Sequence, residues 1–199
     1  MSKQINILYL HGFNSSPQSM KAQLTKQYFN EHFPEVSFFS PQLASSPTTV
    51  IEQLTTLIDS KSDKKNIWCF IGSSLGGYFS TYLSEKYQGK AVLINPAVKP
   101  FELLTDYLGE QTNPYTKDVY YIEKHFIETL KNLEQQFISK NNYLVMVQTG
   151  DEVLDYQKAV DKYRDCQIIV QQGGDHSFID YSKVLPKIAM FFNLYPPSQ

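Results

Sequence analysis

Residues 67–78 read IWCFIGSSLGGY, and this stretch decides the fold. Its first five residues are almost all apolar, which is typical of a strand that is covered on both faces of a parallel sheet. Downstream, apolar residues recur at helical spacing, namely Leu75, Tyr78, Phe79, Tyr82 and Leu83. Between them, residues 72–76 match G-x-S-x-G. A strand, this motif and a helix in succession predict a sharp turn that exposes Ser74 as a nucleophile.

Glycine and serine are also common in turns that carry no chemistry, so the motif alone leaves that interpretation open. The flanking strand and helix favour the catalytic interpretation, because a nucleophilic serine needs this context. A nucleotide-binding loop is a weaker alternative. The stretch does not match G-x-G-x-x-G, and no lysine followed by serine or threonine completes a phosphate-binding loop.

Outward from this stretch, short apolar runs alternate with helical patterns. Strands are predicted at residues 5–10, 36–39, 67–71, 91–94, 143–148 and 167–170. Helices are predicted at residues 18–33, 46–58, 75–83, 156–163 and 183–194, and the first presents Met20, Leu24 and Tyr28 on one face. Such alternation is typical of an α/β protein with helices on both faces of a parallel sheet. We therefore expect six strands in the order 2-1-3-4-5-6, with ligands at their carboxyl ends.

Residues 97–140 interrupt this alternation. They hold no clear strand, but they contain helical patterns at 101–108 and 118–138. The whole chain, 1–199, is therefore predicted to be a single domain. Its core would comprise residues 1–96 and 141–199, and a short helical cap would be inserted at about 97–140.

Charge and composition exclude several classes of protein. The 18 Lys and Arg residues nearly balance 20 Asp and Glu, which argues against a nucleic-acid partner. No apolar run approaches the roughly 20 residues of a membrane span, and the first residues do not resemble a secretory signal, so a cytoplasmic protein is expected. Of the two cysteines, Cys69 lies in an apolar run, and no disulfide framework or cysteine-based metal site is expected. The 14 Tyr and 13 Phe residues can fill a core or line an apolar pocket.

A serine hydroxyl needs an adjacent base to become a good nucleophile. His176 lies in a glycine-rich loop after the last predicted strand, and it follows the serine in the order Ser, Asp or Glu, His. It is therefore the predicted base. His32 is expected at a solvated helix end, and His125 on the surface or at a pocket wall. His11, at the end of the first strand, is expected to position the loop that follows.

The base needs a carboxylate to orient it. Asp151, at the end of the fifth predicted strand, is preferred over Glu152, Asp155 and Asp175. Glu152 and Asp175 are expected to point elsewhere, and Asp155 suits a helix cap. The oxyanion hole is predicted to use the N–H groups of Leu75 and Phe13, since one donor follows the nucleophile and the other comes from the loop after the first strand.

The chain resembles the YqiA/YcfP-type small bacterial esterases of the α/β-hydrolase superfamily. The likeness runs nearly from end to end and rests on residues 10–17, 72–78, 95–98, 148–156 and 173–178, with further similarity at 100–109 and 113–116. It implies the α/β-hydrolase fold, with Ser74, Asp151 and His176 as nucleophile, acid and base. It also implies hydrolysis of small-molecule carboxylic esters or acyl thioesters without a metal or organic cofactor. Lys99 departs from the family where arginine is expected, and Asp175 where asparagine is common.

The expected activity is therefore that of a serine hydrolase, a carboxylesterase or acyl thioesterase that forms an acyl-enzyme. An acyltransferase or a peptidase with the same triad stays open, and so does a non-catalytic binding module on the same fold. Phe13, Tyr115 and Phe178 are the predicted substrate-binding residues. The aromatic residues of the 97–140 segment are expected to form part of the wall of an acyl pocket.

Overall fold

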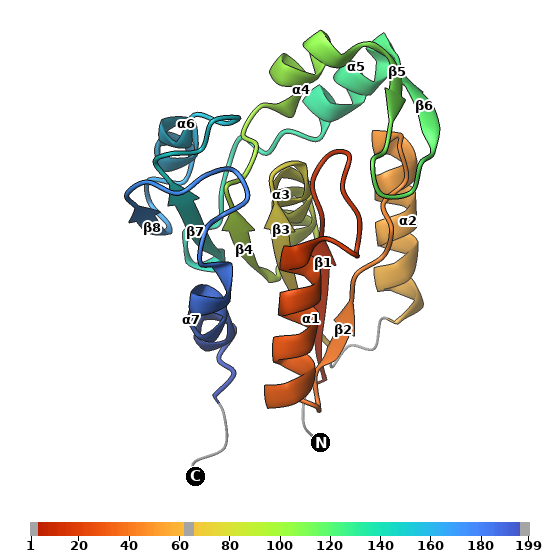
Figure 1. Cartoon of the computed structure of the whole chain (residues 1–199). Coiled ribbons are helices and arrows are strands. Elements are labelled where there is room, and N and C mark those ends of the chain that lie inside the picture. The colour runs from red at the N-terminus through yellow and green to blue at the C-terminus, as the bar shows by residue number, and fades with distance from the viewer. Residues whose placement is uncertain (1–3, 62–65, 196–199) are drawn as a thin grey trace.

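Strands and helices alternate along the chain, as Figure 1 shows for the computed structural model, which describes residues 4–61 and 66–195. The helices are α1 (Met20–His32), α2 (Pro47–Ser60), α3 (Leu75–Tyr87), α4 (Pro100–Leu103), α5 (Lys124–Asn132), α6 (Tyr156–Lys162) and α7 (Leu185–Phe191). The strands are β1 (Ile5–Leu10), β2 (Ser37–Phe39), β3 (Ile67–Ser73), β4 (Lys90–Ile94), β5 (Gly109–Thr112), β6 (Val119–Ile122), β7 (Tyr143–Gln148) and β8 (Gln167–Gln171). Short 3₁₀ helices lie at Leu104–Tyr107, Lys140–Asn142 and Tyr181–Val184. No described helix is long and apolar enough to cross a membrane.

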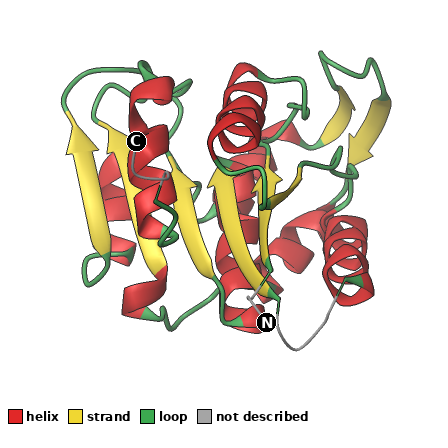
Figure 2. Cartoon of the chain, turned by 90° about the horizontal axis from the view of Figure 1, so that it is seen from below, coloured by secondary structure: helices red, strands yellow, loops and turns green. Residues whose placement is uncertain are grey.

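Six strands form one parallel sheet in the order β2-β1-β3-β4-β7-β8. This confirms the predicted order, because these strands are the six expected from the sequence. β1 and β3 pair in parallel, so the carboxyl ends of both strands lie at one edge of the sheet, as the common direction of the sheet's arrows shows (Figure 2). Ser74 follows β3 directly at that edge, which is where ligands bind in sheets of this kind.

Alternate side chains of the strands point to opposite faces of the sheet, and each face is covered by helices. On one face Leu8 and Leu10 pack with residues of α2 and α3, and on the other Ile7 and Tyr9 pack with residues of α1 and α7. The predicted buried face of the first helix is wrong in part. Ala22, Thr25 and Phe29 are the buried residues of α1, and Met20 is 77% exposed. Met20 is the first residue of α1 and lies at the exposed N-terminal end of the helix.

The segment at 97–140 differs from its expected form because it contains a β-hairpin. β5 and β6 pair in an antiparallel manner, so the predicted helix at 118–138 is wrong at both ends. The observed helix α5 begins at Lys124 and ends at Asn132. The physical reason is the period of the side chains. Val119 and Tyr121 are exposed whereas Tyr120 and Ile122 turn inward, which is the two-residue alternation of a strand.

Apolar residues of this segment belong to the same buried cluster as one face of the sheet. Phe101 precedes the hairpin, and Phe126 and Leu130 on α5 follow it; all three join Phe79 of α3 in this cluster. The Tyr78 hydroxyl also donates a hydrogen bond to the Leu130 carbonyl, at 2.5 Å. The interpretation of residues 97–140 as a cap on a single domain stays a prediction, and the shared cluster supports it.

Candidate active site

Ser74 lies at the junction of β3 and α3 in a strained backbone conformation, with φ 55° and ψ −121°. Its carbonyl accepts hydrogen bonds from the N–H groups of Gly77 and Ala97, at 2.9 and 3.1 Å. A Cβ atom on Gly72 would collide with the carbonyl oxygen of Gly76, and one on Gly76 would collide with that of Leu10. The two glycines of the motif are therefore required by the close approach of β1, β3 and α3.

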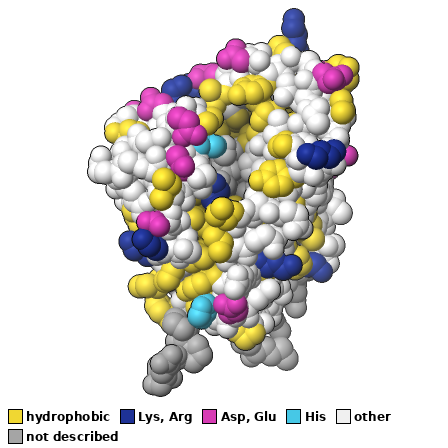
Figure 3. Space-filling model, in the orientation of Figure 1, with side chains coloured by type: hydrophobic (Ala, Val, Ile, Leu, Met, Phe, Trp, Pro, Cys, Tyr) yellow, Lys and Arg dark blue, Asp and Glu magenta, His cyan; other side chains and the backbone are white. Residues whose placement is uncertain are grey.

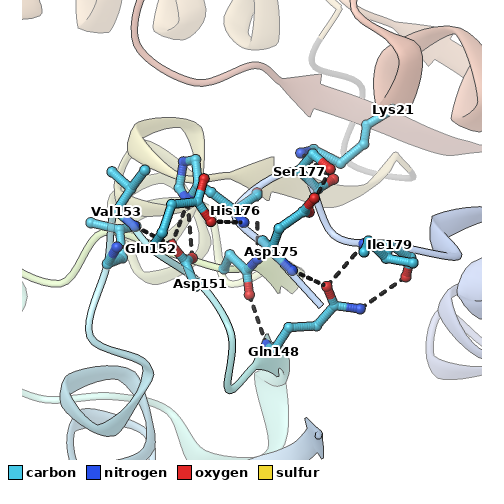
Figure 4. Close-up of polar contacts among 11 residues, drawn as sticks. Lys21, Gln148, Asp151, Glu152, Val153, Asp175, His176, Ser177 and Ile179 are labelled. Carbon is cyan, nitrogen blue, oxygen red and sulfur yellow. Dashed lines mark hydrogen bonds and ion pairs between the residues drawn. The ribbon is translucent and has the colours of Figure 1, made fainter. Parts of the chain in front are cut away.

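His176 and Asp151 face each other across the carboxyl ends of β7 and β8, as Figure 4 shows. The His176 Nδ1 atom lies 2.9 and 3.0 Å from the two carboxylate oxygens of Asp151. The Asp151 side chain is only 2% exposed, and that of His176 is 25% exposed. A buried carboxylate and a partly open imidazole are the arrangement in which an acid orients a base.

The surroundings of Asp151 favour its charged form. Burial acts to raise its pKa, but hydrogen bonds from His176 and from the N–H groups of Leu154 and Val153 outweigh burial, so the pKa is lowered. The two backbone donors lie 2.8 and 2.9 Å from Oδ1. Asp151 is thus held as a carboxylate that accepts a hydrogen bond from the Nδ1–H group of His176.

The rival carboxylates have other contacts. Glu152 accepts a hydrogen bond from the backbone N–H of His176, at 3.0 Å, and so holds the loop rather than the imidazole. Asp155 caps α6 by accepting from the Gln157 N–H. Asp175 accepts from the Ser177 hydroxyl. Among these four carboxylates, a hydrogen bond to the His176 ring is made by Asp151.

Sequence analysis missed Gln148 and Asn95, two buried polar residues that hold the histidine loop. Gln148, at the end of β7, accepts from the N–H groups of Asp175 and Ile179 and donates to the Ile179 carbonyl (Figure 4). Asn95, just after β4, donates to the Asp175 carbonyl at 3.0 Å and accepts from the Gln148 N–H at 3.0 Å. Their position at the ends of apolar strands could have indicated this role, because a buried polar side chain needs hydrogen-bond partners.

Replacing Gln148 with leucine is expected to lower the free energy of unfolding by about 2–4 kcal/mol, because the N–H groups of Asp175 and Ile179, which are part-buried, lose their acceptor. Activity should fall as well, since the loop that carries His176 loses its anchor. Urea unfolding and ester hydrolysis measure the two effects. Gln172→Leu, at an exposed position two residues before Gly174, is the matched control. Equal stability of the two variants would contradict the anchoring role.

Two backbone N–H groups stand beside Ser74 as candidate oxyanion donors. Neither the Leu75 N–H, at the first residue of α3, nor the Phe13 N–H donates a hydrogen bond to another described residue. Free donors of this kind, one at the N-terminus of α3 and one in the loop after β1, suit a developing negative charge.

The loop that carries Phe13 is braced by His11. Its Nδ1 lies 2.9 Å from the Gly12 carbonyl, and its Nε2 accepts the Leu43 N–H at 3.0 Å. Burial lowers the pKa of His11, while its hydrogen bond to the Gly12 carbonyl opposes that shift. A neutral ring that donates through Nδ1 and accepts through Nε2 satisfies both contacts, as expected of a positioning residue.

A cavity of about 650 Å³ is lined by three of the candidate residues, Ser74, His176 and Phe13. Figure 3 shows this face hollowed, with hydrophobic side chains around the hollow and a histidine within it. Tyr115 and Phe178 also line the cavity, although Phe178 is 2% exposed and packs in the core. The residues predicted to bind substrate are thus brought together, and their roles stay predictions.

A second, smaller cavity of about 60 Å³ lies beside the first, and the two share Gly12, Phe13 and Asn14. Its wall is mostly apolar and comes from the core and from the 97–140 segment; it includes Leu75, Val50, Phe79, Leu104, Tyr120, Ile122 and Phe126. Aromatic residues of that segment therefore do line a cavity.

Three other residues singled out by sequence lie outside both cavities. Lys99 pairs with Glu102 on the surface, His125 pairs with Glu123, and His32 ends α1 next to Tyr28. Over residues 4–61 and 66–195, no group of three or more His, Cys, Asp or Glu side chains is arranged to hold a metal ion.

Comparisons with known proteins agree with this architecture. The family described as "Uncharacterised protein family (UPF0227)" matches residues 6–193. A UPF0227 protein of Vibrio parahaemolyticus is 25% identical over 193 residues, which cover 94% of this chain and 99% of that protein. The UPF0227 protein YcfP of Salmonella paratyphi A is 23% identical over 192 residues, with the same coverage of both chains.

Solved structures show the same fold at low sequence identity. Alpha/beta hydrolase domain-containing protein 10 from mouse is 16% identical, with a TM-score of 0.70 over 94% of this chain and 89% of that chain. An esterase domain from a Rhodothermus marinus protein is 13% identical, with a TM-score of 0.67 over 94% and 85% of the two chains. The α/β-hydrolase fold implied by the sequence is thereby confirmed.

Proposed function

We propose, from the premise that this chain belongs to the UPF0227 family and has the α/β-hydrolase fold, that it is a serine hydrolase acting on acyl esters or thioesters. One observation carries the proposal. Ser74, held at positive φ, lines the same cavity as His176, whose Nδ1 contacts the buried carboxylate of Asp151. These are the nucleophile, base and acid of an acyl-transfer site.

The geometry supports a two-step mechanism. Because Nδ1 of His176 contacts Asp151, Nε2 is the nitrogen that takes the proton from the Ser74 hydroxyl. Ser74 Oγ then attacks the acyl carbonyl, and the N–H groups of Leu75 and Phe13 stabilise the oxyanion. His176 returns the proton to the departing alcohol or thiol, which leaves an acyl-enzyme. A water molecule, deprotonated by His176, releases the acid and restores Ser74.

The small cavity suits the acyl chain. It adjoins Leu75 and Phe13, the two oxyanion donors, and its wall is mostly apolar. Its volume of about 60 Å³ is far below that of pockets for drug-sized ligands. A short acyl group fits this space, and each methylene beyond it would have to displace part of the wall.

We therefore expect kcat/KM to be highest for acetyl to butyryl esters. Among longer chains it should fall by about tenfold for each methylene that the pocket rejects. A series of 4-nitrophenyl esters and the matching acyl thioesters, assayed on one preparation, measures this profile. Comparing the thioesters with the matching esters shows whether the enzyme prefers a thiol or an alcohol as the leaving group.

A pair of variants tests whether the wall of the small cavity limits the length of the acyl chain. Phe126→Ala should move the optimum to longer chains, because Phe126 lines the small cavity. Tyr121→Ala is the control, since Tyr121 lies on the outer side of the hairpin and is 57% exposed. A flat profile in the wild type, or an equal shift in both variants, would contradict the acyl pocket.

An acyltransferase or peptidase would pass through the same acyl-enzyme and differ only in the group that accepts or leaves. Product analysis with competing alcohol and amine acceptors separates these activities from hydrolysis. A non-catalytic binding module would show no turnover in any of these assays. The cytoplasmic location also stays a prediction.

A further inference from the structure

The large cavity has a polar inner region that the proposed acyl chemistry does not use. This region extends from Ser74 towards α1 and is lined by Tyr9, Ser19 and Lys21. Lys21 is the sole lysine or arginine among the described residues that line the cavity. In Figure 3 a basic side chain lies within the hollow, near the histidine.

Lys21 is incompletely satisfied by the protein. Its ammonium group donates one hydrogen bond, to the Ser177 carbonyl at 2.9 Å, although an ammonium carries three donors. Burial lowers the pKa of Lys21, and the charges of Asp175 and Asp151 oppose that shift. A cation that is partly removed from water and has free donors favours an anionic partner.

The nearby carboxylates have partners of their own. Asp151 contacts His176, Asp175 accepts from the Ser177 hydroxyl, and Asp180 pairs with Lys183 at 2.8 Å. No ion pair joins Lys21 to a carboxylate of the described residues. The ammonium group is therefore available to a ligand in the cavity.

Tyr9 is the second, independent observation. Its side chain is 1% exposed, it lines the same cavity, and its hydroxyl has no hydrogen-bond partner. Burial raises the pKa of Tyr9 well above its usual range, so the hydroxyl stays a neutral O–H donor. The nearby Ser19 hydroxyl acts to lower that pKa. No hydrogen bond of ordinary geometry joins the hydroxyl of Tyr9 to that of Ser19. An unpaired buried donor on the wall of the cavity that Lys21 also lines indicates a missing acceptor.

The N-terminus of α1 adds to the same region. Ser19 is the N-cap of this 13-residue helix, and its side chain makes no capping hydrogen bond. Ser19, Met20 and Lys21 all line the cavity, so the positive end of the helix faces it. A lysine, an unpaired tyrosine hydroxyl and a helix N-terminus thus converge on one space.

We propose that Lys21 and Tyr9 form a subsite for a negatively charged group, a carboxylate or a phosphate, on the leaving group of the substrate. The proposal rests on the proposed hydrolase function and names the class of its substrate: short acyl esters or thioesters of a large anionic alcohol or thiol. The two cavities suggest how the substrate is divided between its acyl chain and its leaving group. The small apolar one suits the acyl chain, and the large one, which holds Ser74 and Lys21, has room for the leaving group.

The test compares 4-nitrophenyl butyrate with 3-carboxy-4-nitrophenyl butyrate, which differ by one carboxylate on the leaving group. The measured quantity is the ratio of kcat/KM for the anionic ester to that for the neutral one. We expect the wild type to prefer the anionic ester and Lys21→Met to lower the ratio by about tenfold, since a charge-assisted hydrogen bond is lost. Lys21→Arg should keep the ratio within about threefold, and Tyr9→Phe should lower it by about threefold.

Lys26→Met is the matched control, because Lys26 lies exposed on the same helix and outside the cavity lining; its ratio should equal that of the wild type. Lys21 also holds the Ser177 carbonyl, so Lys21→Met can slow both esters by shifting the histidine loop. The ratio separates the two effects. An equal loss for both esters, or a wild type without preference for the anionic ester, overturns the subsite.

A binding measurement distinguishes failure of the subsite from failure of the hydrolase proposal. In the Ser74→Ala background, calorimetric titration with 5-hydroxy-2-nitrobenzoate, the leaving group of the anionic ester, should show binding that Lys21→Met removes. If neither ester is hydrolysed but this binding persists, the hydrolase proposal fails and the anion site stands. Inorganic phosphate and acetate are added as competitors; the stronger competitor identifies the anion, and competition by neither overturns the inference.

Discussion

Ser74→Ala is expected to lower kcat for short nitrophenyl esters by about 10⁶-fold, the loss typical of removing the nucleophile of a serine triad. It should also abolish covalent labelling by a fluorophosphonate probe, which reacts with an activated serine. The reason lies in the turn. Ser74 sits at φ 55° between β3 and α3, on the wall of the cavity that His176 also lines.

The neighbouring serine provides the control for this experiment. Ser73 lines the same cavity but belongs to β3, where its backbone is extended and its side chain is buried. Ser73→Ala should keep the labelling and stay within a few-fold of wild-type activity. Undiminished labelling of Ser74→Ala, or loss of labelling in Ser73→Ala alone, would end the assignment of Ser74 as the nucleophile.

Asp151→Asn is expected to lower kcat by about 10⁴-fold. The substitution keeps the shape of the side chain but offers His176 an amide in place of a carboxylate. The amide favours the wrong tautomer of the ring, and it leaves the imidazolium of the reaction without a negative partner. Because the Asp151 side chain is only 2% exposed, no solvent contact replaces the lost charge.

The rival carboxylates form the matched series. Glu152→Gln, Asp155→Asn and Asp175→Asn should each stay within about tenfold of wild type, because none of these side chains contacts the His176 ring. Steady-state hydrolysis of one ester by all four variants makes the comparison. A larger loss in Asp175→Asn or Glu152→Gln than in Asp151→Asn would move the role of the acid to that residue.

The contact between Asp151 and His176 also predicts how the free energy of unfolding depends on pH. The pKa of Asp151 is lowered in the folded chain, so its ionised form stabilises the fold. This contribution is fully present above the ordinary pKa of aspartate and is lost as the pH falls through the lowered value. Asp151→Asn should therefore flatten the loss of unfolding free energy in that acid range, which urea unfolding at a series of pH values measures.

The sequence by itself determined the sheet, because strands buried on both faces read as apolar runs. β1 and β7 begin and end at the predicted residues, and the strand order follows from the alternation with helices. It also predicted the place of Ser74, since the apolar strand, the G-x-S-x-G motif and the helix pattern follow one another directly in the sequence. The apolar runs and the motif are both patterns of neighbouring residues, and such patterns can be read directly from the sequence.

Only the tertiary structure decided which groups meet. The contacts of His176 with Asp151, and of the histidine loop with Gln148 and Asn95, join residues that are 25 to 80 positions apart. The hairpin of β5 and β6 escaped prediction because its four-residue strands are too short for a clear two-residue period. Lys21 escaped as well, because a lysine at the start of a helix is normally a surface residue. Its contact with Ser177, on the wall of the cavity that Tyr9 also lines, arises from the packing of segments far apart in the sequence, and such packing leaves no periodic signal.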